Sequence, residues 1–126
     1  MKCDDRLERF RRVKRGEIYI ATLDPVIGSE QGGTRPVLVV NNDQDYKYST
    51  TIIVIPITSK VMKKNYTRTH INLIDIDGLA YDSILLCEQP RTIDKRRLIR
   101  KIGQVDEEVL RLAEIAIKRA LDISEG

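Results

Sequence analysis

The sequence predicts a small α+β domain that is mainly β, with short strands arranged as a barrel and one helix at the C-terminus. Three observations support this fold class. The chain has 126 residues, of which 41% are hydrophobic, and this suits one domain with a single core. Several short runs rich in β-branched residues are separated by turns that contain glycine or proline. Sustained helical periodicity is confined to one segment near the C-terminal end.

The first half of the chain contains three predicted strands. Residues 17–23 and 36–41 form the first two, which are joined by a glycine-rich loop. Residues 42–49 are polar and have room for one helical turn. Residues 51–58 indicate a buried strand, in which Pro56 predicts a bulge or a free edge because proline cannot donate a hydrogen bond to a ladder.

The second half continues with shorter strands. Residues 69–75 alternate with period two, and Asp77 with the glycine after it marks the following turn. Residues 83–89 predict the next strand, which residues 91–93 continue beyond a proline. A last short strand at residues 99–104 leads into the helix.

The C-terminal helix has clear signals at both ends. Asp106 is the expected N-cap, while Lys118 and Arg119 complement the helix dipole at the other end. The face expected to pack on the sheet consists of Val109, Leu112, Ala113, Ala116, Ile117, Ala120 and Leu121. We expect this helix to be structural and to carry no functional residue.

Charge is distributed unevenly along the chain. Residues 1–12 are dominated by charged side chains and are interpreted as an N-terminal extension of a single domain at residues 13–126. Basic residues gather in segments 1–15, 60–68 and 91–101, although the formal net charge is only +3. Such segments are typical of proteins that bind nucleic acid, but ordinary solvated faces explain them equally well. With no predicted membrane span or leader, the expected location is cytoplasmic.

Several catalytic chemistries fit the sequence poorly. Acid–base catalysis by two imidazoles is excluded because His70 is the only histidine. The two cysteines lie far apart and form no zinc motif, and Cys87 is expected to be buried with a raised pKa. Residues 28–33 match neither common nucleotide-binding spacing. Three nearby carboxylates flank a turn instead of clustering at strand ends: Asp75, Asp77 and Asp82. We therefore expect no metal ion and no other cofactor.

Arg35 and the hydroxyls of Thr58 and Ser59 remain as candidates for handling a phosphate. Arg35 follows the glycine-rich loop and precedes a proline, which favours an extended backbone and a fixed guanidinium. An exposed arginine at the end of a hairpin loop is an equally good interpretation. Thr58 and Ser59 end a buried strand, where their hydroxyls can contact a phosphate or cap the next turn.

At this point the sequence resembles the MazF/PemK toxins over residues 13–122. The most specific match is the string Gly-Ser-Glu-Gln-Gly-Gly-x-Arg-Pro at residues 28–36, followed by a strand of valine and leucine. Further matches, in the same order as in the family, are Val13-Lys-Arg-Gly-Glu-Ile-Tyr, Asp24-Pro25, Ile57-Thr58 and Glu88-Gln-Pro-Arg-Thr-Ile-Asp-Lys-Arg-Arg-Leu.

The resemblance implies a homodimer of SH3-like (MazF/CcdB-type) β-barrels with a C-terminal helix, which cuts single-stranded RNA without a metal ion. In that family the 2′-hydroxyl attacks the adjacent phosphate and leaves a 2′,3′-cyclic phosphate and a 5′-hydroxyl. The family's catalytic arginine and threonine fall on Arg35 and Thr58. The resemblance implies that Arg35 assists proton transfer and stabilises the phosphorane. Because a free arginine is a poor general base, we expect mainly the electrostatic role.

The same resemblance implies contacts to RNA and to a protein partner. Ser29, Glu30 and Gln31 lie in the loop that closes over RNA in the family, and Arg15 and Gln89 are further expected contacts, as is Ser59. The usual partner is an antitoxin whose acidic, disordered C-terminal segment covers the RNA groove. The resemblance also implies that the toxin contacts DNA only indirectly, through that antitoxin. His70 is expected to be structural or peripheral.

Two other interpretations differ in class from the nuclease. One is a binding module of the same fold that acts on a protein target such as DNA gyrase without cutting RNA. The other is a catalytically silent member that only regulates transcription with its antitoxin.

Overall fold

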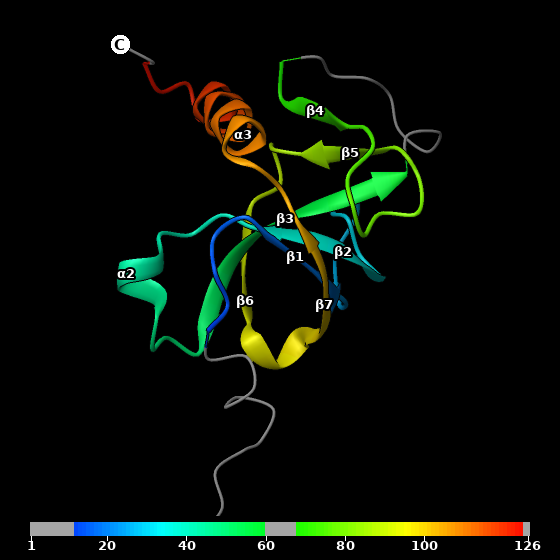
Figure 1. Ribbon diagram of the computed structural model, residues 1–126, viewed down its shortest axis with the longest axis vertical. Coiled ribbons are helices and arrows are strands. Elements are labelled where there is room, and N and C mark those ends of the chain that lie inside the picture. Colours follow the sequence, from blue (N-terminus) through cyan, green and yellow to red (C-terminus); the bar gives the residue numbers. More distant parts are fainter. Residues whose placement is uncertain (1–11, 60–67, 125–126) are drawn as a thin grey trace, which may run out of the picture.

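The computed structural model describes residues 12–59 and 68–124, and it has the predicted fold class: a mainly β domain with a C-terminal helix (Figure 1). The expected extension at residues 1–12, except for Arg12, and the basic residues at 60–67 lie outside the described part. The elements are β1 (Glu17–Thr22), β2 (Thr34–Val39), α2 (Asp43–Tyr46), β3 (Thr51–Ser59), β4 (His70–Leu73), β5 (Ser83–Leu86), β6 (Arg91–Asp94), η2 (Lys95–Arg97), β7 (Leu98–Gln104) and α3 (Glu107–Ala120).

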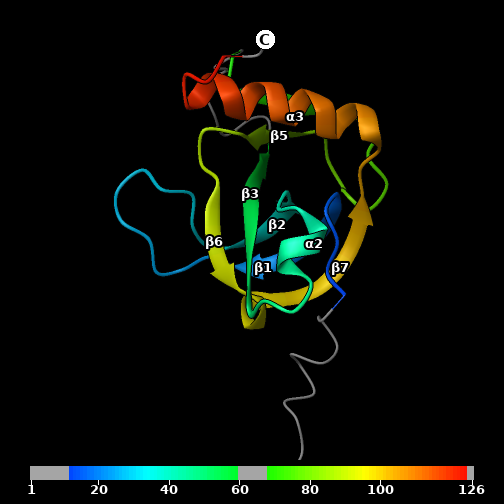
Figure 2. The same cartoon turned by 90° about the vertical axis from the view of Figure 1, so that its left-hand side faces the viewer.

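All strand pairs in the sheet are antiparallel. The strand order is β4-β5-β3-β2-β1-β7, and β6 pairs with β3 outside this path. Within the described residues the pairing does not return from β7 to β4, so the barrel is strongly curved but not closed. Figure 2 shows β3 running between β6 and β2, with α3 lying across one end of the sheet.

The interruption predicted at Pro56 appears as a change of partner along one edge of β3. β6 pairs with residues 51–54 of that edge, and β5 pairs with residues 57–59. Pro56 pairs with Val37 on the opposite edge and falls in the gap between the two partners. β6 therefore continues the line of β5, as predicted, after a turn in which the Gln89 N–H donates to the Leu86 carbonyl at 2.9 Å.

Alternating strand residues face two hydrophobic cores. Ile18 and Leu38 belong to the core beneath α3, whereas their neighbours Tyr19 and Val37 belong to the core enclosed by the curved sheet. Because side chains alternate between the faces of a strand, continuous apolar runs are required where both faces are covered. This explains why the strands predicted at residues 36–41 and 51–58 are almost continuously apolar.

The predicted N-cap of α3 is confirmed, but the predicted buried face is partly wrong. The Asp106 side chain accepts a hydrogen bond from the Val109 N–H at 3.0 Å. Ala113 and Ala116 are buried as expected, and so is Leu110, which was not in the predicted face. Three residues assigned to that face are instead exposed: Leu112, Ala120 and Leu121. The helix rests on a narrow stripe containing two alanines, which allows a close approach to the sheet.

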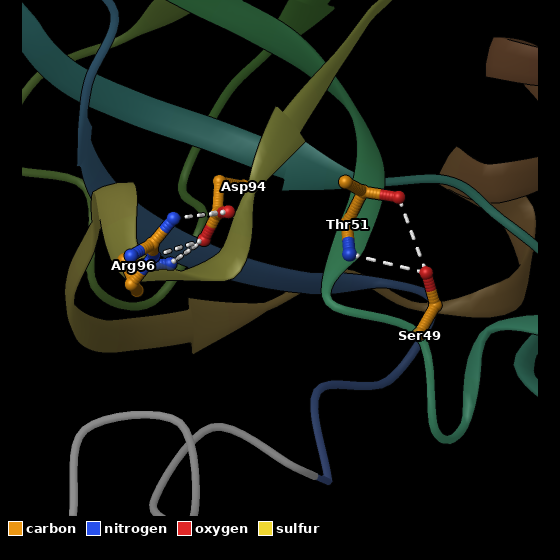
Figure 3. A network of polar contacts seen from close by, with 4 residues as sticks. All are labelled: Ser49, Thr51, Asp94 and Arg96. Carbon is orange, nitrogen blue, oxygen red and sulfur yellow. Dashed lines mark hydrogen bonds and ion pairs between the residues drawn. The ribbon is translucent and has the colours of Figure 1, made fainter. Parts of the chain in front are cut away.

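The end of the sheet at β6 is fixed by local polar contacts (Figure 3). Asp94 accepts from the backbone N–H of Arg96 at 2.8 Å and from its guanidinium at 3.0 and 3.1 Å. Asp94 pairs in register with Thr51, whose N–H donates to the Ser49 hydroxyl at 3.1 Å. The side-chain hydrogen bond from Arg96 holds the pKa of Asp94 below its ordinary value. These contacts define where β6 stops and η2 begins.

Two further expectations concern single features. Cys87 is fully buried, and burial raises the pKa of its thiol to about 12, as the sequence predicted. Among the described residues, no helix has both the length and the apolar character needed to cross a membrane.

Candidate active site

The loop between β1 and β2 is shaped by hydrogen bonds from its own residues. The Leu23 N–H donates to the Gly33 carbonyl at 2.9 Å, and the Gly33 N–H donates to the Asp24 carboxylate at 2.9 Å. At the tip, the Glu30 carboxylate accepts from the Ile27 N–H at 2.8 Å. These bonds hold the base and the tip of the loop in one conformation and fix the start of β2.

The two glycines before β2 meet different geometric requirements. A Cβ atom on Gly32 would lie 2.6 Å from both the Asp24 carboxylate and the Val26 side chain, so a larger residue would force these side chains to move. Gly33 has a φ of +78°, a conformation that other residues rarely adopt. The loop therefore turns sharply immediately before β2, in which Arg35 is the second residue.

Arg35 is held from three sides at the start of β2. Its Nε–H donates to the Gly32 carbonyl at 2.6 Å, and Nη1 donates to the Thr58 hydroxyl at 3.3 Å. With its side-chain oxygen turned toward the guanidinium, Gln31 accepts from the two Nη atoms at 2.9 and 3.1 Å. This arrangement restricts the guanidinium to one plane and one direction.

The charge of Arg35 is influenced by two opposing effects. Burial lowers the pKa of its guanidinium from the ordinary value, while the negative charge of Asp24 raises it. Desolvation disfavours the charged form, and a neighbouring carboxylate favours it. An arginine that is partly desolvated in this way interacts more strongly with a bound anion than one in open water.

Arg35 and Thr58 line a cavity of about 330 Å³, which we call the Arg35 cavity. Thr58 is buried and Ser59 is exposed at the end of β3, where Ser59 pairs in register with Ser83 of β5. The described residues lining the cavity include no acidic side chain: Ile20, Arg35, Pro36, Ile57, Thr58, Ser59, Gly78, Leu79, Ala80, Tyr81, Ser83, Arg100 and Ile102. Its hydroxyls and guanidinium groups therefore favour an anionic ligand.

The remaining loop candidates line a second cavity, of about 290 Å³, which we call the Gln31 cavity. Its lining residues are Ser29, Glu30, Gln31, Glu88, Gln89, Pro90 and Arg91. The Gln31 N–H donates to the side-chain oxygen of Gln89 at 2.9 Å. Because Gln31 also contacts Arg35, it connects the two cavities.

Arg15 lies elsewhere in the structure. Its side chain donates to the Val40 carbonyl at 2.7 Å and forms an ion pair with Glu114 of α3. Val40 follows β2 at the end opposite Arg35, and five residues of strand span roughly 16 Å. Arg15 is therefore not grouped with the other candidates, and its contact with RNA stays a prediction.

Among the lining residues of the Arg35 cavity that were not predicted individually, Tyr81 and Arg100 have large polar or charged side chains. Tyr81 follows the turn at Asp77, and Arg100 lies on β7. The basic segment 91–101 is the only sequence signal that included Arg100. Of its other basic residues, Arg91 lines the Gln31 cavity and Lys95 is buried. The remaining three are committed elsewhere: Arg96 pairs with Asp94, Arg97 donates to the Thr22 and Asp24 carbonyls, and Lys101 pairs with Glu17.

His70 lies outside both cavities. It is buried, and its Nε2 lies 3.0 Å from a carboxylate oxygen of Glu88. Within residues 12–59 and 68–124, no group of three or more His, Cys, Asp or Glu side chains is arranged to hold a metal ion.

Known proteins share both the sequence and the fold. Residues 14–121 match the family of PemK-like, MazF-like toxins of type II toxin–antitoxin systems. Endoribonuclease EndoA of Bacillus subtilis (strain 168) is 46% identical over 113 residues, which cover 86% of this chain and 94% of EndoA. Endoribonuclease MazF of Staphylococcus epidermidis is 43% identical over 118 residues, covering 90% and 92% of the two chains.

Solved structures agree with this relationship. The Mycobacterium tuberculosis toxin MazF-mt6 superposes with a TM-score of 0.71 at 27% identity, covering 86% of this chain and 98% of the toxin. MazF from Deinococcus radiodurans has the same fold, with a TM-score of 0.75 at 23% identity and coverage of 87% and 96%. With a family match over most of its length and close relatives named as endoribonucleases, this chain belongs to the PemK-like, MazF-like toxins of type II toxin–antitoxin systems.

Proposed function

We propose that this protein is a metal-independent endoribonuclease that cleaves single-stranded RNA, including mRNA in the cytoplasm, at short specific sequences. One observation carries the proposal: the Arg35 guanidinium and the Thr58 hydroxyl, 3.3 Å apart, line one cavity. A guanidinium and a hydroxyl that converge in this way can both bind the non-bridging oxygens of one phosphate. The endoribonuclease names of the relatives described above give the proposal its reaction class.

The proposed reaction is an internal transesterification. The 2′-oxygen attacks the adjacent phosphorus and loses its proton to a base, while the bond from phosphorus to the 5′-oxygen breaks. The 5′-oxygen takes up a proton, which leaves a 2′,3′-cyclic phosphate and a 5′-hydroxyl. The phosphorane carries additional negative charge on its non-bridging oxygens, so Arg35 and Thr58 accelerate the step by stabilising that charge.

Recognition of the RNA is proposed to involve the Gln31 cavity. Ser29, Glu30, Gln31 and Gln89 provide donors and acceptors of the kind that read the edges of unpaired bases. Ser59 lies beside Thr58 and is assigned a contact to the RNA backbone. Arg15 is retained as a more distant contact.

We further propose that the protein is a homodimer controlled by an antitoxin with an acidic, disordered C-terminal segment. An endoribonuclease from a mycobacterial species that shares the fold has been solved in complex with its cognate antitoxin, as has MazE–MazF of Deinococcus radiodurans. An acidic segment would be attracted to the same basic side chains as RNA. The antitoxin therefore inhibits cleavage by competing with RNA for one surface. Any contact with DNA would be made through the antitoxin.

Cleavage of a long single-stranded RNA in excess EDTA, with mapping of the cut ends, tests the activity. The protein should cut at defined positions and leave cyclic phosphates. Arg35→Ala should reduce the rate by about 10²–10³-fold, the cost of removing one preorganised charge-stabilising group. Arg35→Lys should recover little of the lost cleavage rate, because an ammonium group does not reproduce the planar arrangement of donors in a guanidinium.

Arg111→Ala, which removes an exposed arginine from α3, is the matched control and should cleave normally. Thermal unfolding of each variant should show that the fold is retained. An inactive protein, or equal cleavage by Arg35→Ala, would contradict the proposed function.

A further inference from the structure

The Arg35 cavity contains an exposed aromatic ring that the proposed chemistry does not use. Tyr81 is 78% exposed and lines the same cavity as Arg35 and Thr58. Its carbonyl accepts a hydrogen bond from the Ser83 hydroxyl at 2.9 Å, which anchors its backbone at the start of β5. An exposed ring on an anchored backbone next to a phosphate-binding group is a suitable platform for an unpaired base.

The wall that carries Tyr81 is fixed against β7 by contact between two backbones. A Cβ atom on Gly78 would lie 1.9 Å from the Ile102 carbonyl oxygen, and one on Gly103 would lie 2.3 Å from the Asp77 carbonyl oxygen. No side chain separates the turn from the strand. The segment leading to Tyr81 is therefore positioned by the same strand that carries Arg100.

Arg100 gives this wall a positive charge. Arg35 and Arg100 are the two charged side chains among the described lining residues, and neither faces an acidic residue in that lining. Arg100 is exposed, unlike the partly buried Arg35. Two guanidinium groups on one cavity suit a ligand with more than one negative charge, such as a nucleic acid strand, better than a single small anion.

We infer that Tyr81 and Arg100 form a subsite for a nucleotide next to the scissile phosphate. The base stacks on the Tyr81 ring, and the phosphate of that nucleotide accepts hydrogen bonds from Arg100. This inference rests on the proposed function, because Arg35 and Thr58 define the position of the scissile phosphate. It assigns to Tyr81 a role in binding and positioning the strand, without participation in bond breaking.

Tyr48 provides a matched comparison elsewhere on the surface. It is 76% exposed, nearly the same as Tyr81, but the Lys47 ammonium lies over its ring, 5.3 Å from the centroid. Its cavity is a different one, lined by Arg12, Val13, Lys14, Asp43, Lys47 and Tyr48. Tyr48→Ala therefore removes an equally exposed tyrosine without altering the Arg35 cavity.

The first test measures kcat and KM for cleavage of an RNA oligonucleotide that contains one mapped cut. Tyr81→Ala should raise KM about tenfold, within the range found for loss of one stacked base. Tyr81→Phe should retain the wild-type KM because the ring is kept. Tyr48→Ala should also cleave normally. Equal KM values for Tyr81→Ala and Tyr48→Ala would overturn the inference.

The second test identifies which base stacks on Tyr81, by combining the Tyr81→Ala variant with removal of single bases from the RNA. Oligonucleotides with one abasic nucleotide are tested at each position around the cut, with wild type and with Tyr81→Ala. At one position, removal of the base should raise the KM of wild type about tenfold. The KM of Tyr81→Ala should not rise further at that position, because the stacking contact is already lost. Full additivity at every position would show that Tyr81 stacks on no base.

The third test separates Arg100 from a general charge effect. Binding of an oligonucleotide with a 2′-deoxy nucleotide at the cut, which cannot be cleaved, is measured over a range of salt concentrations. Arg100→Gln should reduce the slope of log K against log[salt] by about 0.7, the value for one phosphate contact to a single strand. Arg111→Gln should leave the slope unchanged, and an equal effect of both variants would contradict the assignment of Arg100.

The outcomes also distinguish this inference from the proposed function. If wild type cuts no RNA, the nuclease proposal fails and the subsite inference fails with it. If wild type cuts RNA but Tyr81→Ala and Arg100→Gln behave as their matched controls do, the subsite inference alone fails.

Discussion

Thr58 illustrates how one residue can contribute separately to the fold and to the chemistry. Its backbone pairs with Ile84 inside the sheet, while its hydroxyl contacts the Arg35 guanidinium. Thr58→Val keeps the shape of the side chain and removes only the hydroxyl. Because one transition-state contact is lost, kcat should fall at least about tenfold with little change in KM.

Single-turnover cleavage and thermal unfolding of Thr58→Val provide the measurements. Thr92→Val on β6, which removes an exposed threonine hydroxyl, should keep full activity. If Thr58→Val unfolded the protein or broke the dimer, the hydroxyl would belong to the structure, as in the turn-capping interpretation of the sequence.

At the level of residues, the sequence singled out Arg35 and Thr58, which the structure brings together at one cavity, but not the other walls of that cavity. The glycine-rich loop and the following proline pointed to Arg35, and the end of a buried strand pointed to Thr58 and Ser59. Tyr81 was not predicted as a site residue, because a single tyrosine beside a turn has no distinguishing local pattern. Its place beside Arg35 depends on strands that are distant in sequence, so only tertiary structure reveals it.

Helix α3 offers a test of which face supports the fold. Leu110 is 6% exposed and packs close to Gly16, whereas Leu112 is 44% exposed. Leu110→Ala should reduce the free energy of unfolding by about 2–5 kcal/mol, the usual cost of truncating a buried leucine. Leu112→Ala should change it by less than about 1 kcal/mol.

Unfolding of both variants in urea, at one fixed protein concentration, provides the comparison. A larger loss for Leu112→Ala would place the buried face where the sequence pattern put it and would contradict the structure.

At the level of elements, the strands and the start of the helix were predictable, while the buried face of the helix was predictable only in part. Asp106 marks the start of α3 through a contact within the helix itself, so local sequence is sufficient. Which apolar residues face inward depends on the surface beneath, where Gly16 leaves room for Leu110. Leu110 and Leu112 are equally apolar, and their spacing alone does not separate them.

The buried thiol of Cys87 makes the stability of the whole molecule sensitive to alkaline pH. Burial raises the pKa of this thiol from the ordinary 9.0 to about 12. Between these values the folded protein keeps a proton that the unfolded chain releases, so the free energy of unfolding should fall as pH rises from about 9 to 12. Below pH 9 the contribution is fully present.

Comparison of wild type with Cys87→Ala, by urea unfolding at several pH values, isolates the thiol. The variant is expected to be less stable at neutral pH but to lose less stability as the pH rises. The buried Lys95, whose pKa is lowered by burial, acts in the opposite sense but equally in both proteins. Parallel curves for the two proteins would contradict a role for Cys87.

For the whole molecule, composition and strand pattern predicted one mainly β domain, but the arrangement of its cavities was not predictable. β3 exchanges one partner for another at Pro56, and this exchange places the start of β5 at the Arg35 cavity while the turn before β6 reaches Gln31. The sequence indicated an interruption at this proline. It did not indicate which strands would meet there, because pairing between distant strands leaves no local signal.

The contact between Gly78 and Gly103 has a consequence for how such a toxin diverges during evolution. Neither position accepts even a methyl group, so the backbone of this wall resists change. The neighbouring side chains of Ala80, Tyr81 and Arg100 are exposed and can be exchanged at little cost in stability. A lineage could therefore acquire a new RNA target by replacing these side chains, while the backbone that carries them, and the pair of Arg35 and Thr58 proposed to bind the phosphate, stay the same.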